Sequence, residues 1–147
     1  MIAEIISIGT ELLLGHILNT NTAFLSQKLA ESGIDVYNTS VVGDNPQRMV
    51  EALTQALERS DIVITTGGLG PTVDDVTIET IAKFTGRKLV LDRTILKDLK
   101  DYFKLRNVKF PAETMRQAYI PEGVKWIRNM VGTAPGLVID HKGRVIV

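Results

Sequence analysis

The sequence contains no cysteine, few aromatic residues and no net charge. Without cysteine, a disulfide-stapled scaffold and thiol chemistry are both excluded, and a reducing, cytoplasmic location is expected. Aromatic residues make up 5% of the chain, which leaves few platforms on which nucleic-acid bases could stack. The 17 basic residues balance 17 acidic ones, so no overall field attracts nucleic acid or an anionic membrane.

Long apolar runs are missing as well. The N-terminal run IAEIISIG is too short to cross a membrane and lacks the basic flank of a signal peptide. With 147 residues, 44% of them hydrophobic, the chain is long enough to bury roughly two thirds of its unfolded surface. We therefore predict a single globular domain, residues 1–147, that binds neither nucleic acid nor a membrane.

The first half of the sequence repeats a strand–helix pattern. Short β-rich apolar runs predict strands at Ile2–Ile8, Asp35–Val42 and Asp61–Thr66. Helical patterns with capping residues follow them at Asn21–Ser32, Pro46–Ser60 and Val76–Thr85. Three such units in succession predict parallel strands joined by right-handed crossovers. The expected fold is a three-layer α/β sandwich, a mostly parallel sheet flanked by helices.

The second half is less regular. A short strand is predicted at Lys88–Leu91, a helix capped by Asp92 after it, and one or two helical turns at Pro111–Ala118. Gly136–Asp140 and Arg144–Val147 flank a turn and predict a C-terminal β-hairpin. Because the chain stops at Val147, inside a predicted strand, we expect the domain to be truncated at its C-terminal end.

Polar or glycine-rich clusters follow each of the first three predicted strands. They are Gly9-Thr10-Glu11, Gly43-Asp44-Asn45 and GGLGPTVDDVT, residues Gly67–Thr77, which we call the glycine loop. In an open parallel sheet, ligands bind outside the carboxyl ends of the strands. Three clusters that meet at one edge predict a ligand site there.

The glycine loop has features of a phosphate site. Gly67, Gly68 and Gly70 lack a Cβ, so their N–H groups can approach a ligand, and the following helix points its positive dipole end there. The spacing matches neither the dinucleotide fingerprint nor a Walker A loop. Asp74 and Asp75 would repel a bare phosphate, but Mg²⁺ is commonly held by one or two carboxylates plus phosphate oxygens. The loop therefore predicts a phosphate site that includes a divalent cation.

Each of these signals also has a purely structural interpretation. Glycines after a strand commonly form only a turn, and an Asp or Thr before a helix is commonly its N-cap. On its own, Asp44 is favoured as a helix cap over a metal ligand. Neighbouring carboxylates point different ways, so at most one of Asp74 and Asp75 is expected to bind a metal. Glu11, between a strand end and the apolar run LLLG, is expected at the edge of the core.

Five segments together resemble the molybdenum-cofactor-biosynthesis (molybdopterin-binding) domain family, and within it the N-terminal domain of the competence/damage-inducible CinA proteins. They are GTELLLG (Gly9–Gly15), NTN (Asn19–Asn21), VVGDN (Val41–Asn45), TTGGLGPTVDDVT (Thr65–Thr77) and NMVGTAPG (Asn129–Gly136). The wider family typically has GG-T-G in the loop, followed by Arg-Asp. Here Leu69 replaces the threonine, Asp74 replaces the arginine and Asp75 matches the acidic residue, which is the CinA-like form.

The resemblance implies metal-dependent hydrolysis of the pyrophosphate of ADP-ribose or a related nucleotide. The alternative is a non-catalytic molybdopterin- or nucleotide-binding module that serves a separate partner domain. The resemblance further implies that Asp75 and Asp44 hold Mg, Mn or Co and are catalytic, with Glu11 as a weaker catalytic candidate. Implied phosphate and nucleotide contacts are Gly9, Thr10, Thr66, Gly67, Gly68, Gly70, Thr72, Asn129, Gly132, Thr133, Ala134 and Gly136.

Two further expectations follow from the resemblance. Relatives form dimers or trimers, so a homo-oligomer is implied. Family members also continue past the last strand into a second proline-glycine segment and a helix, which lie beyond Val147. One side of the implied site is therefore expected to be missing from this chain. A plain structural α/β domain remains the third interpretation.

Overall fold

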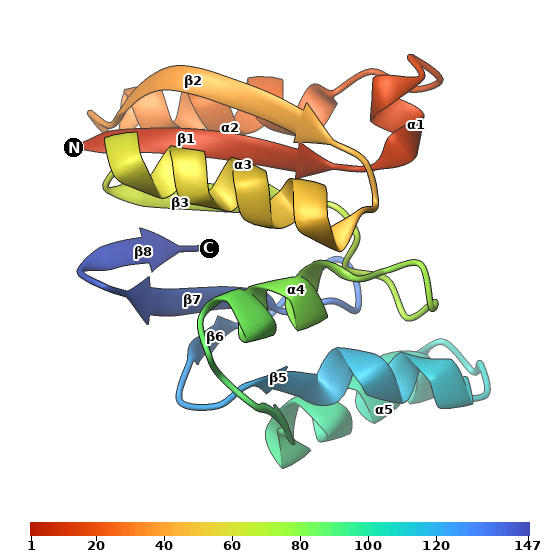
Figure 1. Ribbon diagram of the computed structural model, residues 1–147. Helices are drawn as coiled ribbons and strands as arrows, with labels where there is room; N and C mark the ends of the chain where they lie inside the picture. The colour runs from red at the N-terminus through yellow and green to blue at the C-terminus, as the bar shows by residue number, and fades with distance from the viewer.

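The computed structural model describes residues 1–147, which form helices and strands in the alternating order expected from the sequence (Figure 1). The strands are β1 (Ile2–Ile8), β2 (Asp35–Val42), β3 (Ile62–Thr66), β4 (Leu89–Leu91), β5 (Tyr119–Pro121), β6 (Lys125–Ile127), β7 (Gly136–His141) and β8 (Arg144–Ile146). The helices are α1 (Thr10–Leu13), α2 (Thr20–Glu31), α3 (Pro46–Arg59), α4 (Thr77–Phe84), α5 (Arg93–Leu105) and the 3-10 helix η1 (Ala112–Ala118). None of the helices combines the length and apolarity that crossing a membrane requires.

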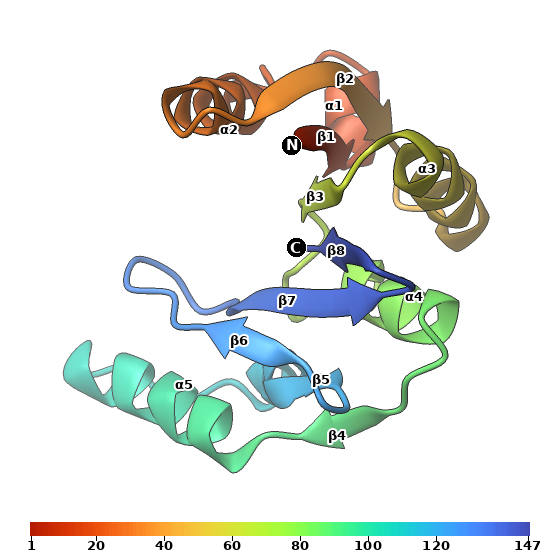
Figure 2. The same ribbon diagram turned by 90° about the vertical axis from the view of Figure 1, so that its left-hand side faces the viewer.

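Six strands form one sheet in the order β2-β1-β3-β8-β7-β6, and β4 pairs with β5 in a separate two-stranded sheet. The pairs β1–β2, β1–β3 and β3–β8 are parallel, and β7 is antiparallel to both of its neighbours. Helices α2 and α5 lie on one side of this sheet, and α3 and α4 lie on the other (Figure 2). The predicted three-layer α/β sandwich with a mostly parallel sheet is confirmed.

The central strand β1 is buried along almost its whole length. From Ala3 to Ile8, no residue is more than 3% exposed. A parallel strand covered on both faces needs a nearly continuous apolar run, because successive side chains point to opposite faces. The isoleucines Ile5, Ile6 and Ile8 meet this need, and Ile6 and Ile8 belong to the main core cluster.

The C-terminal hairpin is confirmed, and it lies within the main sheet. Its turn consists of Lys142 and Gly143, whose φ angles of 51° and 79° suit a two-residue hairpin turn with both residues left-handed. Strand β8 inserts between β7 and β3, and the pairing extends to Val147, whose N–H donates to the Val63 carbonyl at 2.8 Å.

Two helix caps explain where α3 and α5 begin. The Asp92 carboxylate accepts hydrogen bonds from the N–H groups of Thr94 and Ile95, as predicted. At α3 the prediction for Asp44 is wrong, because Asn45 is the cap and its Oδ1 accepts from the Arg48 N–H at 3.1 Å. The extended backbone of Asn45 precedes Pro46, which holds the first helical position. Asp44 is therefore left free for another contact.

Glu4 is the one charged side chain in the buried part of β1. It is 2% exposed, and its carboxylate accepts two hydrogen bonds of 2.8 Å from Nε and Nη2 of Arg59, at the end of α3. The hydrogen bond and the charge of Glu4 raise the pKa of the Arg59 guanidinium. This bidentate pair satisfies the buried carboxylate and joins α3 to the sheet.

We expect Arg59→Met to lower the melting temperature, because it leaves the Glu4 carboxylate buried without its partner. Arg59 is half-exposed and Glu4 is buried, so the cost comes from the carboxylate left without a partner. Glu4→Leu/Arg59→Met removes that carboxylate and should therefore melt above Arg59→Met. Thermal unfolding followed by circular dichroism measures both. Arg48→Met, which removes only an exposed pair with Glu51, serves as the control. A double variant no more stable than Arg59→Met would contradict the prediction.

Candidate functional site

The predicted clusters meet at one edge of the sheet, on the right in Figure 1. This edge carries the carboxyl ends of β1, β2, β3 and β8, and antiparallel β7 begins there. Side chains join neighbouring clusters. Asp44 Oδ2 accepts hydrogen bonds from the N–H and the hydroxyl of Thr10, at 3.0 and 2.9 Å. Asn21 Nδ2 donates to Thr66 Oγ1 at 3.1 Å.

Two glycines at the end of β3 are required by close contacts within the protein. Gly67 has a φ of 103°, and a Cβ on it would lie 1.9 Å from the carbonyl oxygen of Ile8. Gly68 has a φ of 60°, and a Cβ there would lie 2.3 Å from Thr77 Oγ1. That hydroxyl donates to the Gly67 carbonyl at 2.9 Å. Both positions therefore need glycine whether or not a ligand binds.

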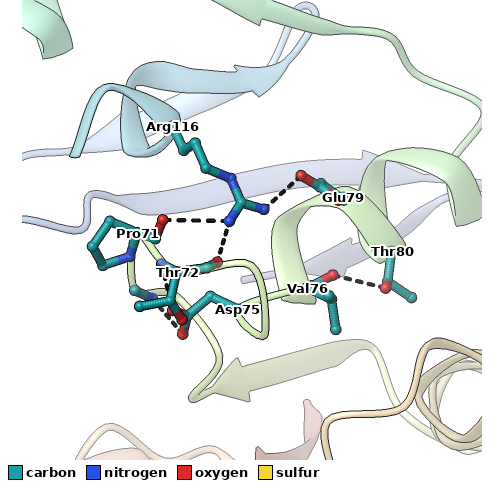
Figure 3. Close-up of polar contacts among 8 residues, drawn as sticks. Pro71, Thr72, Asp75, Val76, Glu79, Thr80 and Arg116 are labelled. Carbon is teal, nitrogen blue, oxygen red and sulfur yellow. Dashed lines mark hydrogen bonds and ion pairs between the residues drawn. The ribbon is translucent and has the colours of Figure 1, made fainter. Parts of the chain in front are cut away.

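Asp75 turns its carboxylate back into the glycine loop (Figure 3). Oδ1 accepts from the Gly70 N–H at 2.8 Å, and Oδ2 accepts from the N–H and the hydroxyl of Thr72 at 2.9 and 2.6 Å. A Cβ on Gly70 would lie 2.5 Å from Oδ2, so this glycine also makes room for the carboxylate. The protein's own anion thus occupies donors that the sequence assigned to phosphate.

These contacts change the acidity of Asp75. Burial is the largest influence and by itself raises the pKa of the carboxyl. The hydrogen bonds from Thr72 and Gly70, together with the charge of Arg116, outweigh burial and leave the pKa below its ordinary value. Asp75 is therefore a carboxylate that stabilises its loop in the ionised form.

Two adjacent side chains of η1 hold the glycine loop from the other side. Arg116 Nη1 donates to the carbonyls of Pro71 and Thr72, and Nη2 pairs with Glu79 Oε1 at 2.9 Å (Figure 3). Gln117 Nε2 donates to the Leu69 carbonyl at 2.8 Å.

The sequence analysis missed both Arg116 and Gln117. They lie 44 to 48 positions beyond the carbonyls that they bind, and no spacing rule links such distant residues. A polar Arg-Gln pair between Pro111 and Pro121 was the only available signal.

A cavity of about 260 Å³, which we call the loop cavity, opens between the glycine loop, η1 and the start of β7. Its apolar lining comes largely from Ile78, Leu89, Ile120 and Leu137. Its polar side chains are Asp75, Glu79, Arg116, Gln117 and Tyr119. Four residues predicted for the site line it, namely Gly68, Gly70, Asp75 and Ala134.

The other predicted residues lie outside the loop cavity. Glu11, Thr66 and Gly67 line a cavity of about 130 Å³ beside α1 and α2. Asn129, Gly132 and Thr133 line one of about 240 Å³ against α5. None of these three cavities is lined by Gly9, Thr10, Asp44, Thr72 or Gly136. The residues implied for one site are therefore divided among separate hollows along the same edge.

Asn129 shapes its own loop. Its Oδ1 accepts from the N–H groups of Val131 and Gly132 at 2.9 and 2.8 Å, and its Nδ2 donates to the Ala134 carbonyl at 2.9 Å. Ala134 and Pro135 then reach the loop cavity. Asn129 does not line the loop cavity, but it holds the backbone of the residues that do, through its hydrogen bond to the Ala134 carbonyl.

The side chains do not assemble a complete metal centre. No three His, Cys, Asp or Glu side chains are grouped closely enough to hold an ion. Asp75 lines the loop cavity, whereas Asp44 lines none of the three cavities described above. Asp75 also already accepts three hydrogen bonds out of about four that a carboxylate can accept. A divalent cation fits at Asp75 only if ligand phosphates and water supply most of its shell, as is common for Mg²⁺.

We expect Asp75→Asn to destabilise the fold at neutral pH by on the order of 1–2 kcal/mol, since an amide cannot accept all three hydrogen bonds. The folded-state pKa lies below the ordinary value, so the stabilisation is complete above about pH 4 and is lost as the pH falls through the folded pKa. Urea unfolding at pH 7 and pH 3 should show the gap to wild type closing at low pH. Asp74→Asn, at an exposed position, is the control. A gap that stays constant with pH would contradict this role.

Residues 4–147 match the family model described as "Probable molybdopterin binding domain". A CinA-like protein of Kosmotoga olearia is 54% identical over the whole chain, and a CinA-like protein of Dictyoglomus turgidum is 50% identical. The chain spans 36% of the length of each of these two relatives.

Solved structures agree with this assignment. The crystal structure of CinA from Thermoplasma acidophilum, described as a protein of unknown function, superimposes with a TM-score of 0.88 at 38% identity. The match covers 99% of this chain and 85% of that one. MogA, at 17% identity and a TM-score of 0.63, shares the fold, with 100% of this chain and 82% of MogA covered. The chain belongs to the molybdopterin-binding domain family, and within that family to the CinA-like proteins.

Proposed function

We propose that this domain binds a phosphorylated nucleotide at the loop cavity and hydrolyses the pyrophosphate of ADP-ribose or a related nucleotide with the help of a divalent cation. The observation that carries the proposal is the composition of the loop cavity. It combines apolar side chains for the face of a heterocycle with polar groups from the glycine loop, α4 and η1. The choice of ADP-ribose rests on the CinA-like form of the loop, with Asp74-Asp75.

The size of the loop cavity limits which part of the ligand it holds. A volume of about 260 Å³ suits one heterocycle and not a whole dinucleotide. The base of ADP-ribose would lie over Ile78, Ile120 and Leu137, and its phosphates would lie towards the open edge. The apolar lining excludes water around the base, and Asp75 keeps the glycine loop in the shape that borders it.

A divalent cation, Mg, Mn or Co, would be held by the remaining lone pair of Asp75 together with ligand oxygens. Asp44, whose Oδ2 binds Thr10, and Glu11 lie further along the edge and are proposed as secondary acidic groups. When bound, such a cation would neutralise charge on the pyrophosphate and polarise the attacking water. The protein's own part is to bind the base, orient the pyrophosphate and keep the ionised Asp75 in place.

A non-catalytic binding module is the second candidate, and one observation favours it. The carboxylate of Asp75 is engaged within its own loop, and no group of three His, Cys, Asp or Glu side chains is close enough to hold an ion. A domain that binds a nucleotide or molybdopterin for a partner domain needs the loop cavity but no metal centre. A homo-oligomer of two or three subunits and a cytoplasmic location remain predictions from the sequence.

The proposal predicts that the protein converts ADP-ribose to AMP and ribose 5-phosphate in the presence of Mg²⁺, Mn²⁺ or Co²⁺. Asp75→Ala should lower the rate by at least about tenfold, because it removes both the loop contacts and a cation ligand. Asp74→Ala, an exposed neighbour, should retain the rate of the wild type. Chromatography of the reaction mixture measures AMP directly.

Three results would change the assignment. Equal rates for Asp75→Ala and wild type would remove Asp75 from the site. Loss of activity in Asp44→Ala with an unchanged melting temperature would show that Asp44 belongs to the metal site. A melting temperature raised by ADP-ribose, without AMP from any of the three metals, would support the binding module.

A further inference from the structure

We propose that Arg116 recognises the phosphate of the ligand, an assignment that rests on the proposed phosphorylated ligand of the loop cavity. The sequence assigned this task to backbone N–H groups of the glycine loop. In the structure, the N–H groups of Gly70 and Thr72 already donate to Asp75. The negative charge of that carboxylate also repels a second anion at the same donors. The N–H groups of Gly70 and Thr72 are therefore poor donors for a phosphate, and a cationic side chain at the same cavity can supply the missing attraction.

Arg116 is the only lysine or arginine among the 14 residues that line the loop cavity. The cavity also carries two carboxylates, Asp75 and Glu79. Arg116 offsets one of these two negative charges, and without it the cavity would present only negative charge to an incoming phosphate. The guanidinium is thus the one group of the cavity whose charge attracts a phosphorylated ligand.

The contacts of Arg116 leave it able to bind an anion. Its side chain is 35% exposed, and Figure 3 shows the guanidinium between the glycine loop and Glu79 on α4. It makes hydrogen bonds to two backbone carbonyls, at Pro71 and Thr72, and to one Glu79 oxygen. A guanidinium has five N–H donors, so these three contacts leave donors over.

The acceptors that Arg116 can bind differ in the strength of the hydrogen bonds they form with a guanidinium. Backbone carbonyls are neutral acceptors, and a phosphate that offers two oxygens forms shorter, charge-assisted hydrogen bonds with the guanidinium fork. A phosphate at the mouth of the cavity can therefore replace the contacts with Pro71 and Thr72. The ion pair with Glu79 would keep the Arg116 side chain over the cavity during this exchange, so Glu79 is a positioning residue for Arg116.

The test compares the affinities of ADP-ribose and of adenosine, which contains no phosphate, by isothermal titration calorimetry with and without Mg²⁺. We expect Arg116→Met to weaken ADP-ribose binding at least about tenfold and adenosine binding less than about twofold. Arg116→Lys should fall between, because an ammonium keeps the charge but not the fork. Arg128→Met is the matched control, since Arg128 pairs with Asp98 outside the loop cavity. Melting temperatures check that each variant is folded.

Two outcomes would overturn the assignment. Unchanged affinity of Arg116→Met for ADP-ribose would show that the guanidinium does not meet the phosphate. Equal losses for ADP-ribose and adenosine would show that Arg116 only clamps the glycine loop. If wild type binds ADP-ribose but releases no AMP, the proposal of hydrolysis is wrong, and the measured affinities still decide the role of Arg116. If wild type binds neither ADP-ribose nor inorganic pyrophosphate, both proposals fail.

Discussion

The parallel pairing of β1 with β2 and β3 is the constraint on which the candidate site depends. Strand β1 is buried and hydrogen-bonded along both edges, so its register with each neighbour is closely defined. Because parallel strands end at the same edge, the pairing brings Gly9, Gly43 and Gly67 together. It also places Gly67 against the carbonyl of Ile8, at a separation that only glycine permits. A slip of one residue in this register would displace the start of the glycine loop.

Asp75 shows why a glycine loop followed by carboxylates can be interpreted in two ways from sequence, as a site for an external anion or as a loop that binds the protein's own carboxylate. The loop has the backbone freedom and the donors of an anion site, and in the structure it binds an anion that belongs to the protein. This internal contact gives the loop a defined shape before any ligand arrives. In our proposal the task of attracting phosphate therefore falls to a cationic side chain from elsewhere in the fold, and Arg116 is the one that borders the same cavity.

The division of the edge into separate hollows has a physical cause. The chain between β6 and β7 is folded around the side chain of Asn129, and Pro135 near its end borders both the loop cavity and the cavity against α5. This segment therefore separates two hollows that a flat edge would have joined. Ala134 and Pro135 border the loop cavity there, and the side chain of Asn129 faces its own loop.

The sequence by itself determined the layered α/β architecture, the main strands and helices, and the edge at which the polar clusters gather. These depend on local periodicity, capping residues and the rule that parallel strands end together, all of which act over short stretches of chain. The cap of α3 was misassigned by one residue, because Asp44 and Asn45 have similar local preferences. Only the tertiary structure decided the partners of Asp75, the clamp formed by Arg116 and Gln117, and the separation of the cavities. Some of those features arise from contacts between segments 44 or more positions apart, and others from the exact direction of a single side chain. The hydrophobic pattern of the sequence contains information about neither.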